Sequence, residues 1–347
     1  MIDFRYHLVS IVAVFLALAI GIVLGSTELQ GPAYNFLNKT TAKLQSELDQ
    51  VTSQRDTAQQ QASQNELYAQ AVEPAVLRDL LTGQRLLIVT EPGAQSSVTN
   101  GISTAAIDAG ATVTGQINLA PKFFDTSGTT QDSLNQTTLD VAQAANITLD
   151  TSATYQQQAA QVIASETLTT SAGSTSSGSS SSPSADVQSA DAGTMLQAYA
   201  ASQFLSTTGQ PARPATLAIV VTPQNAPSDG SADQLDQVLI PLVQELAAKS
   251  SATVVVGSSS GSGAGSPIAV LRSDNVSNQV STVDDADLVS GQTVAIQALA
   301  VRLVGGKAGS YGFTANGATA VAPSPAPTPT ASPSATPTTS STKKKAK

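Results

Sequence analysis

A chain of 347 residues is long enough for two folded domains, and its composition excludes several classes of function. It contains no Cys and no Trp, so an exported form builds neither a disulfide nor a thiolate metal site, and a net charge of −9 argues against nucleic-acid binding. The single His, His7, stands beside the first apolar segment, which excludes an imidazole base from any folded domain further along the chain.

The first 25 residues, MIDFRYHLVSIVAVFLALAIGIVLG, predict a membrane anchor. No residue from Leu8 to Leu24 is charged. As a helix rising about 1.5 Å per residue, this stretch spans roughly 26 Å, close to a hydrocarbon core of about 30 Å. A signal peptide cleaved after Val23-Leu24-Gly25 is the alternative. We favour a retained anchor over residues 1–28, because the charged region before the apolar run is weak and the run is longer than in a typical signal peptide.

The charges on either side of this span predict its orientation. Arg5 precedes the span, and Glu28 is the first charged residue after it. By the positive-inside rule, the N-terminus lies in the cytoplasm and the bulk of the chain is extracytoplasmic. The sequence therefore predicts a single-pass protein of the cell membrane or envelope, which contacts lipid through its N-terminal helix.

Residues 35–70 predict a helix with a heptad pattern. Seam residues recur at alternate spacings of four and three, which is typical of a coiled coil. The seam positions are Leu37, Thr41, Leu44, Leu48, Val51, Arg55, Ala58, Ala62 and Asn65. Gln, Ser and Thr occupy most of the other positions. This favours a parallel coiled coil that forms a homo-oligomer over one amphipathic helix packed on its own domain.

Residues 72–317 predict an α/β domain, because short aliphatic runs alternate with helical patterns. Such alternation is typical of a mostly parallel sheet flanked by helices. The predicted strands are 85–90, 112–119, 216–222, 253–257, 268–272 and 281–283, and the predicted helices are 98–109, 132–145, 153–168, 194–205, 231–249 and 291–304. We expect Pro241 to kink the helix at 231–249 or to begin a new segment.

Two segments are too polar or too rich in Pro to build a core. Residues 169–189 are almost wholly Ser, Thr, Gly and Ala, which predicts a disordered insertion. Residues 318–347 form a Pro-, Ala-, Ser- and Thr-rich stretch with a Lys-rich end, which predicts an extended, disordered tail. The basic end either solubilises the tail, which we favour, or contacts anionic wall polymer or lipid.

Three motifs invite a chemical interpretation. Gly257–Gly261 matches G-x-S-x-G, the motif of a hydrolase nucleophile elbow, but such an elbow needs a following helix and a His partner. The same glycines could suggest a phosphate-binding loop, but that loop needs a following helix and a Lys-Ser/Thr ending. We therefore predict a loop between strands. Asp284, Asp285 and Asp287 would suit a hard cation such as Ca²⁺, although a solvated turn that caps the next helix is favoured. Thr90–Gly93 follows the first strand, where open α/β sheets bind ligands.

These motifs leave no residue assigned to a site. We predict no catalytic residue, no cofactor-binding residue and no metal ligand, and we expect the chain not to be an enzyme. Soft metals select thiolate, thioether and imidazole ligands, whereas the chain beyond the anchor contains no Cys or His and only Met195.

Several stretches in order are similar to one actinobacterial family, the copper transport protein MctB family. They are residues 7–26 (HLVSIVAVFLALAIGIVLGS), 51–56 (VTSQRD), 83–85 (GQR), 281–285 (STVDD) and 309–312 (GSYG). The resemblance covers residues 1 to about 313. It implies copper homeostasis at a mycobacterial-type envelope, with copper efflux through an outer-membrane pore and association with the outer membrane.

Two functional hypotheses follow. The resemblance implies a membrane-anchored protein of copper homeostasis and efflux, through which copper passes without an identifiable binding site. One apolar helix makes no pore by itself, so an oligomer or a partner protein would form the path. The residues alone suggest the alternative, a non-enzymatic envelope scaffold or interaction protein without a copper role.

Overall fold

The computed structural model describes residues 3–170, 185–223, 232–259, 266–313 and 317–324, with no side chains described at 26–33, 185–191 and 232–236. The chain divides into two compact units, residues 1–67 and 68–347. Each unit is described by itself.

In its described residues, the first unit is one helix. Helix α1 runs from Asp3 to Leu77, so that its last turns belong to the second unit, and it contains both the predicted anchor and the predicted heptad segment. Phe4–Gly25 is long and apolar enough to cross a membrane, with a mean hydropathy of 2.9. The apolar seam residues Leu44, Leu48 and Val51 are 53%, 61% and 62% exposed, so they face no other part of this unit.

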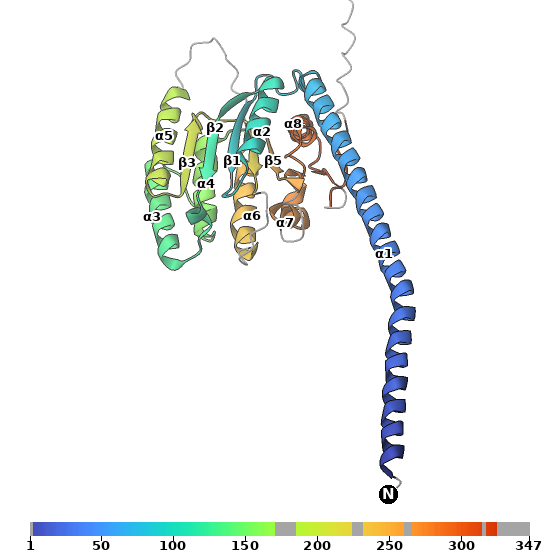
Figure 1. Ribbon diagram of the computed structural model, residues 1–347. Coiled ribbons are helices and arrows are strands. Elements are labelled where there is room, and N and C mark those ends of the chain that lie inside the picture. Colours follow the sequence, from blue (N-terminus) through green and yellow to red (C-terminus); the bar gives the residue numbers. More distant parts are fainter. Residues whose placement is uncertain (1–2, 171–184, 224–231, 260–265, 314–316, 325–347) are drawn as a thin grey trace, which may run out of the picture. The chain divides into compact units, whose positions relative to one another are not determined.

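The second unit is built on a seven-stranded sheet in the order β3-β2-β1-β4-β5-β6-β7 (Figure 1). All neighbouring strands are parallel except β2 and β3, which are antiparallel. The strands are β1 (Arg85–Thr90), β2 (Thr112–Leu119), β3 (Leu205–Gly209), β4 (Leu217–Val221), β5 (Ala252–Val256), β6 (Ser281–Val283) and β7 (Ser310–Tyr311). This confirms the predicted α/β class with a mostly parallel sheet.

Helices cover both faces of the sheet, which explains the unbroken aliphatic runs in its central strands. Every residue of β4 (LAIVV) and β5 (ATVVV) is buried, because strands covered on both faces have no polar side. The end of α1 packs on one face with α2 (Ser96–Asp108) and α8 (Val289–Leu303). The other face is covered by α3 (Gly128–Ala144), α4 (Tyr155–Thr167), α5 (Ala185–Ala201), α6 (Ala232–Lys249) and α7 (Pro267–Ser273).

The predicted strand at 268–272 is wrong, because these residues lie in α7. Ser266 is the N-cap of this helix and accepts a hydrogen bond from the backbone N–H of Ala269 at 3.2 Å, and Pro267 occupies the first turn. Both are helix-start signals. The apolar run IAVLR is too short for its periodicity to distinguish a strand from a helix.

Strand β3 was not predicted, because the predicted helix at 194–205 was extended too far. Helix α5 ends at Ala201, and Gln203 then adopts a positive φ of 61° that no helix continues through. Leu205 is buried, while the rest of β3 is exposed. An exposed edge strand of this composition carries no apolar alternation that the sequence could display.

The remaining segments differ from expectation in smaller ways. Helix α5 begins at Ala185, inside the predicted insertion, of which residues 171–184 lie outside the described residues. Helix α6 continues through Pro241 as one element, so this proline begins no new segment, and the kink stays a prediction. Beyond Gly317, Ala320 forms a single bridge with Tyr311, and residues 325–347 of the predicted tail lie outside the described residues.

Candidate functional site

The strand order reverses between β1 and β4. The chain leaves β1 toward β2 on one side of the sheet and leaves β4 toward β5 on the other. In open α/β sheets, the carboxyl ends of the strands at such a reversal form the usual ligand crevice. Thr90–Gly93 lies there, as predicted, since the backbone N–H of Glu91 donates to the carbonyl oxygen of Val221 at the end of β4 over 3.0 Å.

Glu91 is an uncompensated acid at this reversal. Glu91 is 3% exposed, and neither of its carboxylate oxygens has a hydrogen-bond partner in the described part of the chain. Burial raises the pKa of this carboxyl to about 8, because desolvation disfavours the charged form. At neutral pH the side chain is therefore mostly an uncharged carboxylic acid.

Asp284 follows β6 and is fully buried, but it is paired with a cation. Arg272 of α7 donates from Nη1 to Asp284 Oδ2 at 2.8 Å, and its side chain is only 7% exposed. The same guanidinium donates to the Thr282 hydroxyl at 3.0 Å and to the Tyr311 carbonyl at 2.7 Å. Phe313 N–H donates to the other oxygen of Asp284 at 2.9 Å. Arg272 thus connects α7 with β6 and β7.

Asp285 and Asp287 have separate roles. Burial raises the pKa of Asp285 to about 6, the charge of Asp284 adds to the shift, and Asp285 Oδ1 has no hydrogen-bond partner among the described residues. Asp287 accepts from the backbone N–H and the hydroxyl of Ser259 at 2.8 and 2.9 Å. The predicted solvated turn is wrong for Asp284 and Asp285, which are buried. The N-cap of α8 is Leu288, without a side-chain cap.

The serine motif is placed in a structural loop. Of Gly257–Gly261, residues 260 and 261 lie outside the described residues. The Ser259 hydroxyl donates to Asp287, and the backbone of Gly257 bonds to Val283 and Ala286. Among the described residues, the next α-helix is α7, where a strand was predicted, but the second unit contains no His to activate a serine.

The donors at the carboxyl edge do not fit a resident copper centre. They are hard carboxylate oxygens, whereas copper prefers sulfur and imidazole nitrogen. The described residues contain no group of three or more His, Cys, Asp or Glu placed to hold a metal ion. Met195 is 8% exposed in the core on the α5 side, and His7 lies in the first unit. The absence of metal ligands stays a prediction.

Two features of this edge were not predicted from the sequence. The burial of Glu91 had a weak signal, a Glu-Pro-Gly turn directly after an apolar strand. Arg272 was placed in a strand and given no role, although it is a single cation twelve residues before a pair of aspartates. Which side chains meet depends on the packing of α7 against the sheet, and periodicity does not report that packing.

Comparison with known proteins gives the wider context. The sequence matches the model of a family described as "Copper transport outer membrane protein, MctB" over residues 1–323. The protein named Copper transporter MctB in Mycobacterium tuberculosis is 28% identical over 325 residues, which cover 93% of this chain and 100% of the relative. Its counterpart in Mycobacterium leprae is 27% identical over 330 residues, which cover 92% of this chain and 99% of the relative.

The family description and the apolar helix at Phe4–Gly25 together support a location in the membrane or envelope. Because the match extends over nearly the whole chain, it confirms the resemblance drawn from the sequence. The chain belongs to the MctB family of copper transport outer membrane proteins.

Proposed function

We propose that this chain is a non-enzymatic, membrane-anchored envelope protein that exports copper. The observation that carries the proposal is the family match over residues 1–323, together with relatives named for copper transport that align along almost their whole length. The chemistry of the carboxyl edge agrees with a role outside catalysis, since Ser259 and Asp287 bond to each other and the second unit lacks histidine.

The anchor is a single membrane pass by Phe4–Gly25. Arg5 on the N-terminal side favours a cytoplasmic N-terminus and an extracytoplasmic α/β unit. Copper is the cargo rather than a resident cofactor, because the second unit supplies only one thioether and no thiolate or imidazole. A single helix does not enclose a path for copper across the membrane, so several copies of the chain or a partner protein form that path.

The test of this function is the copper content of cells. We expect a deletion strain of the native host to accumulate more cell-associated copper than its parent as external copper rises, and the reintroduced gene to restore the parental level. Elemental analysis measures copper, and zinc in the same samples is the control. Unchanged copper together with altered cell shape or permeability would instead support the envelope scaffold, which the lack of soft ligands favours.

The oligomer has a test of its own, because a chain without cysteine allows single-thiol crosslinking. Leu44 lies on the exposed seam, whereas Ser46 lies on the opposite side of the same heptad. We expect L44C to form a disulfide-linked dimer in oxidised membranes, and S46C to remain largely monomeric on the same gel. Equal and low crosslinking of both variants would argue that the seam has no second copy against it.

A further inference from the structure

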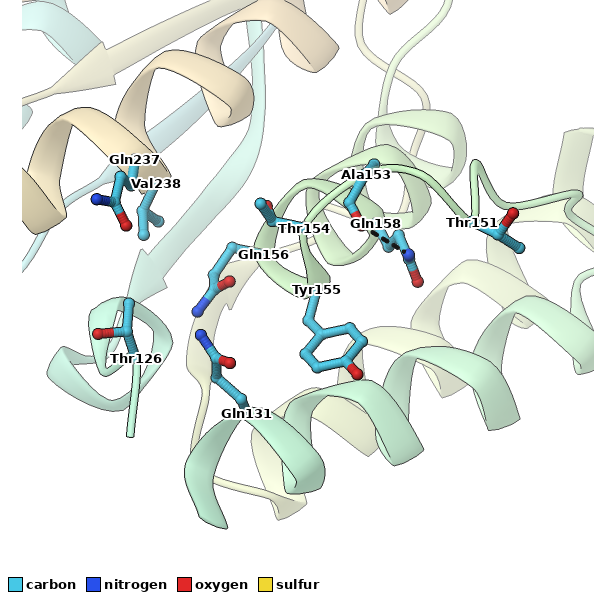
Figure 2. A pocket seen from close by; sticks show the side chains of 10 residues that line it. All are labelled: Thr126, Gln131, Thr151, Ala153, Thr154, Tyr155, Gln156, Gln158, Gln237 and Val238. Carbon is cyan, nitrogen blue, oxygen red and sulfur yellow. Dashed lines mark hydrogen bonds between the residues drawn. The ribbon is translucent and has the colours of Figure 1, made fainter. Parts of the chain in front are cut away.

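A polar cavity of about 350 Å³ lies among α3, α4 and α6 (Figure 2), and neither Glu91 nor Arg272 is among its described lining residues. Its described residues come from the loops before α3 and α4, from the first turns of these two helices, and from α6. The lining residues are Thr126, Gln131, Thr151, Ala153, Thr154, Tyr155, Gln156, Gln158, Gln237 and Val238. All of these side chains are uncharged, and most carry a hydroxyl or a carboxamide.

One lining side chain lacks a partner that its burial demands. Gln156 is 3% exposed, and its Nε2 makes no hydrogen bond within the described part of the chain. Figure 2 shows the carboxamides of Gln156 and Gln131 turned toward each other from two different helices. A buried amide donor without an acceptor destabilises a fold, so an acceptor supplied by a ligand would compensate it.

A second lining carboxamide, that of Gln158, is held in place by hydrogen bonds. Gln158 Nε2 donates to the carbonyl oxygens of Asp150 at 3.1 Å and Ala153 at 3.0 Å. These bonds fix the carboxamide and leave its oxygen as the acceptor that this side chain offers. The ring of Tyr155 lies beside Gln131 in Figure 2 and supplies a flat wall.

The uncharged character of the described lining residues indicates which class of ligand the pocket suits. Among the described lining residues there is no Lys or Arg to act as a counterion for a phosphate or carboxylate, and no Asp or Glu to act as one for a cation. Carboxamides and hydroxyls both donate and accept, which matches a ligand covered with neutral hydroxyl groups. An aromatic wall suits the apolar face of a sugar ring, and the volume lies at the small end of ligand pockets.

We propose that this pocket binds a neutral hexopyranose, either as a free sugar or as the terminal unit of a neutral glycan. Gln156 and Gln131 would bond neighbouring ring hydroxyls, Gln158 would accept from a third, and Tyr155 would pack against the ring. The proposal does not depend on copper export, so each can fail without the other.

Binding is measured with the full chain in a detergent that has no sugar headgroup, by saturation-transfer NMR. The probes are glucose, mannose and galactose as free sugars, maltotriose as a glycan end, and glucuronate and glucosamine as charged comparators. We expect at least one neutral hexose to bind more tightly than both charged sugars. Binding of maltotriose at the strength of glucose identifies a glycan end, whereas binding of free hexose alone identifies a solute. Failure of every neutral sugar, or tighter binding of a charged one, overturns the proposal.

Adjacent glutamines provide a matched pair of variants. Gln156→Leu removes the unpartnered amide. Gln157→Leu changes the next residue, whose Nε2 donates to Glu245 Oε1 at 3.3 Å and which does not line the cavity. We expect Q156L to lower hexose affinity by about 3- to 10-fold while its Tm is unchanged or raised, and Q157L to bind as the wild type does. Q131A, at a half-buried position, repeats the test if Q156L does not fold. Equal affinities of all the variants would contradict the assignment.

Discussion

Replacing Glu91 by glutamine is expected to stabilise the protein at pH 8 and to leave its stability nearly unchanged at pH 4.5. Burial raises the folded-state pKa of Glu91 from 4.5 to about 8. The folded protein therefore holds a proton that the unfolded chain has released throughout this interval. The contribution of Glu91 to the free energy of unfolding is therefore complete below pH 4.5. It is lost as the pH rises from 4.5 to 8, and it changes no further above pH 8. Glutamine cannot ionise, so E91Q does not show this loss.

The size of the effect follows from the width of the interval. Each pKa unit corresponds to about 1.4 kcal/mol, so the stability difference between E91Q and wild type grows to at most about 5 kcal/mol by pH 8. Taking the difference at each pH removes the contribution of the other titrating groups. Denaturant unfolding of the detergent-solubilised protein, followed by tyrosine emission because the chain lacks tryptophan, measures it.

A second acid provides the matched control. Burial raises the pKa of Asp285 only from 3.8 to about 6, so the advantage of D285N over wild type is expected to stop growing near pH 6. That of E91Q is expected to continue to grow up to pH 8. A stability difference for E91Q that stays constant with pH would show that Glu91 gains a counterion or water in solution and is not desolvated.

Removing Arg272 is expected to destabilise the fold by about 3–5 kcal/mol. Arg272→Met leaves Asp284 buried and without its cation, which costs more than the loss of an ordinary hydrogen bond. It also removes the hydrogen bonds to Thr282 and Tyr311 that connect α7 with β6 and β7. The free energy of unfolding at pH 7 measures this loss.

Two further variants separate the buried charge from the lost contacts. R272M/D284N removes both charges, while the introduced carboxamide keeps an oxygen for Phe313 N–H, so this double variant should be more stable than R272M. R55M breaks an exposed pair of similar length, Arg55 to Asp56 at 2.7 Å, and should change stability by no more than about 0.5 kcal/mol. If R272M and R55M destabilise equally, the Arg272 pair is not buried in solution.

The sequence predicted the parts of the fold that local patterns encode. Strands β1, β4 and β5 are continuous aliphatic runs, and each was placed within two residues of its observed bounds. The patterns failed where local signals were ambiguous, at the short run in α7, or absent, at the exposed strand β3.

The candidate sites were harder to predict, since they arise from contacts between distant segments. The sequence marked Thr90–Gly93 and the aspartates as locations, but Arg272 reaches Asp284 only because α7 packs beside β6. The polar cavity joins α3, α4 and α6, and its glutamines have no spacing in the sequence that sets them apart from the exposed glutamines of the chain. Burial turns such ordinary residues into distinctive ones, and only the tertiary structure reports it.

Helix α1 has a consequence for how the folded unit is produced in isolation. Leu77, the last residue of the helix that begins with the apolar span, is fully buried in the core of the second unit, and Glu73 nearby accepts a hydrogen bond from Thr293 at 3.2 Å. A truncation designed at the start of β1 would therefore open a hole beneath α8. The boundary for a soluble fragment lies upstream of Glu73, within a helix rather than in a linker.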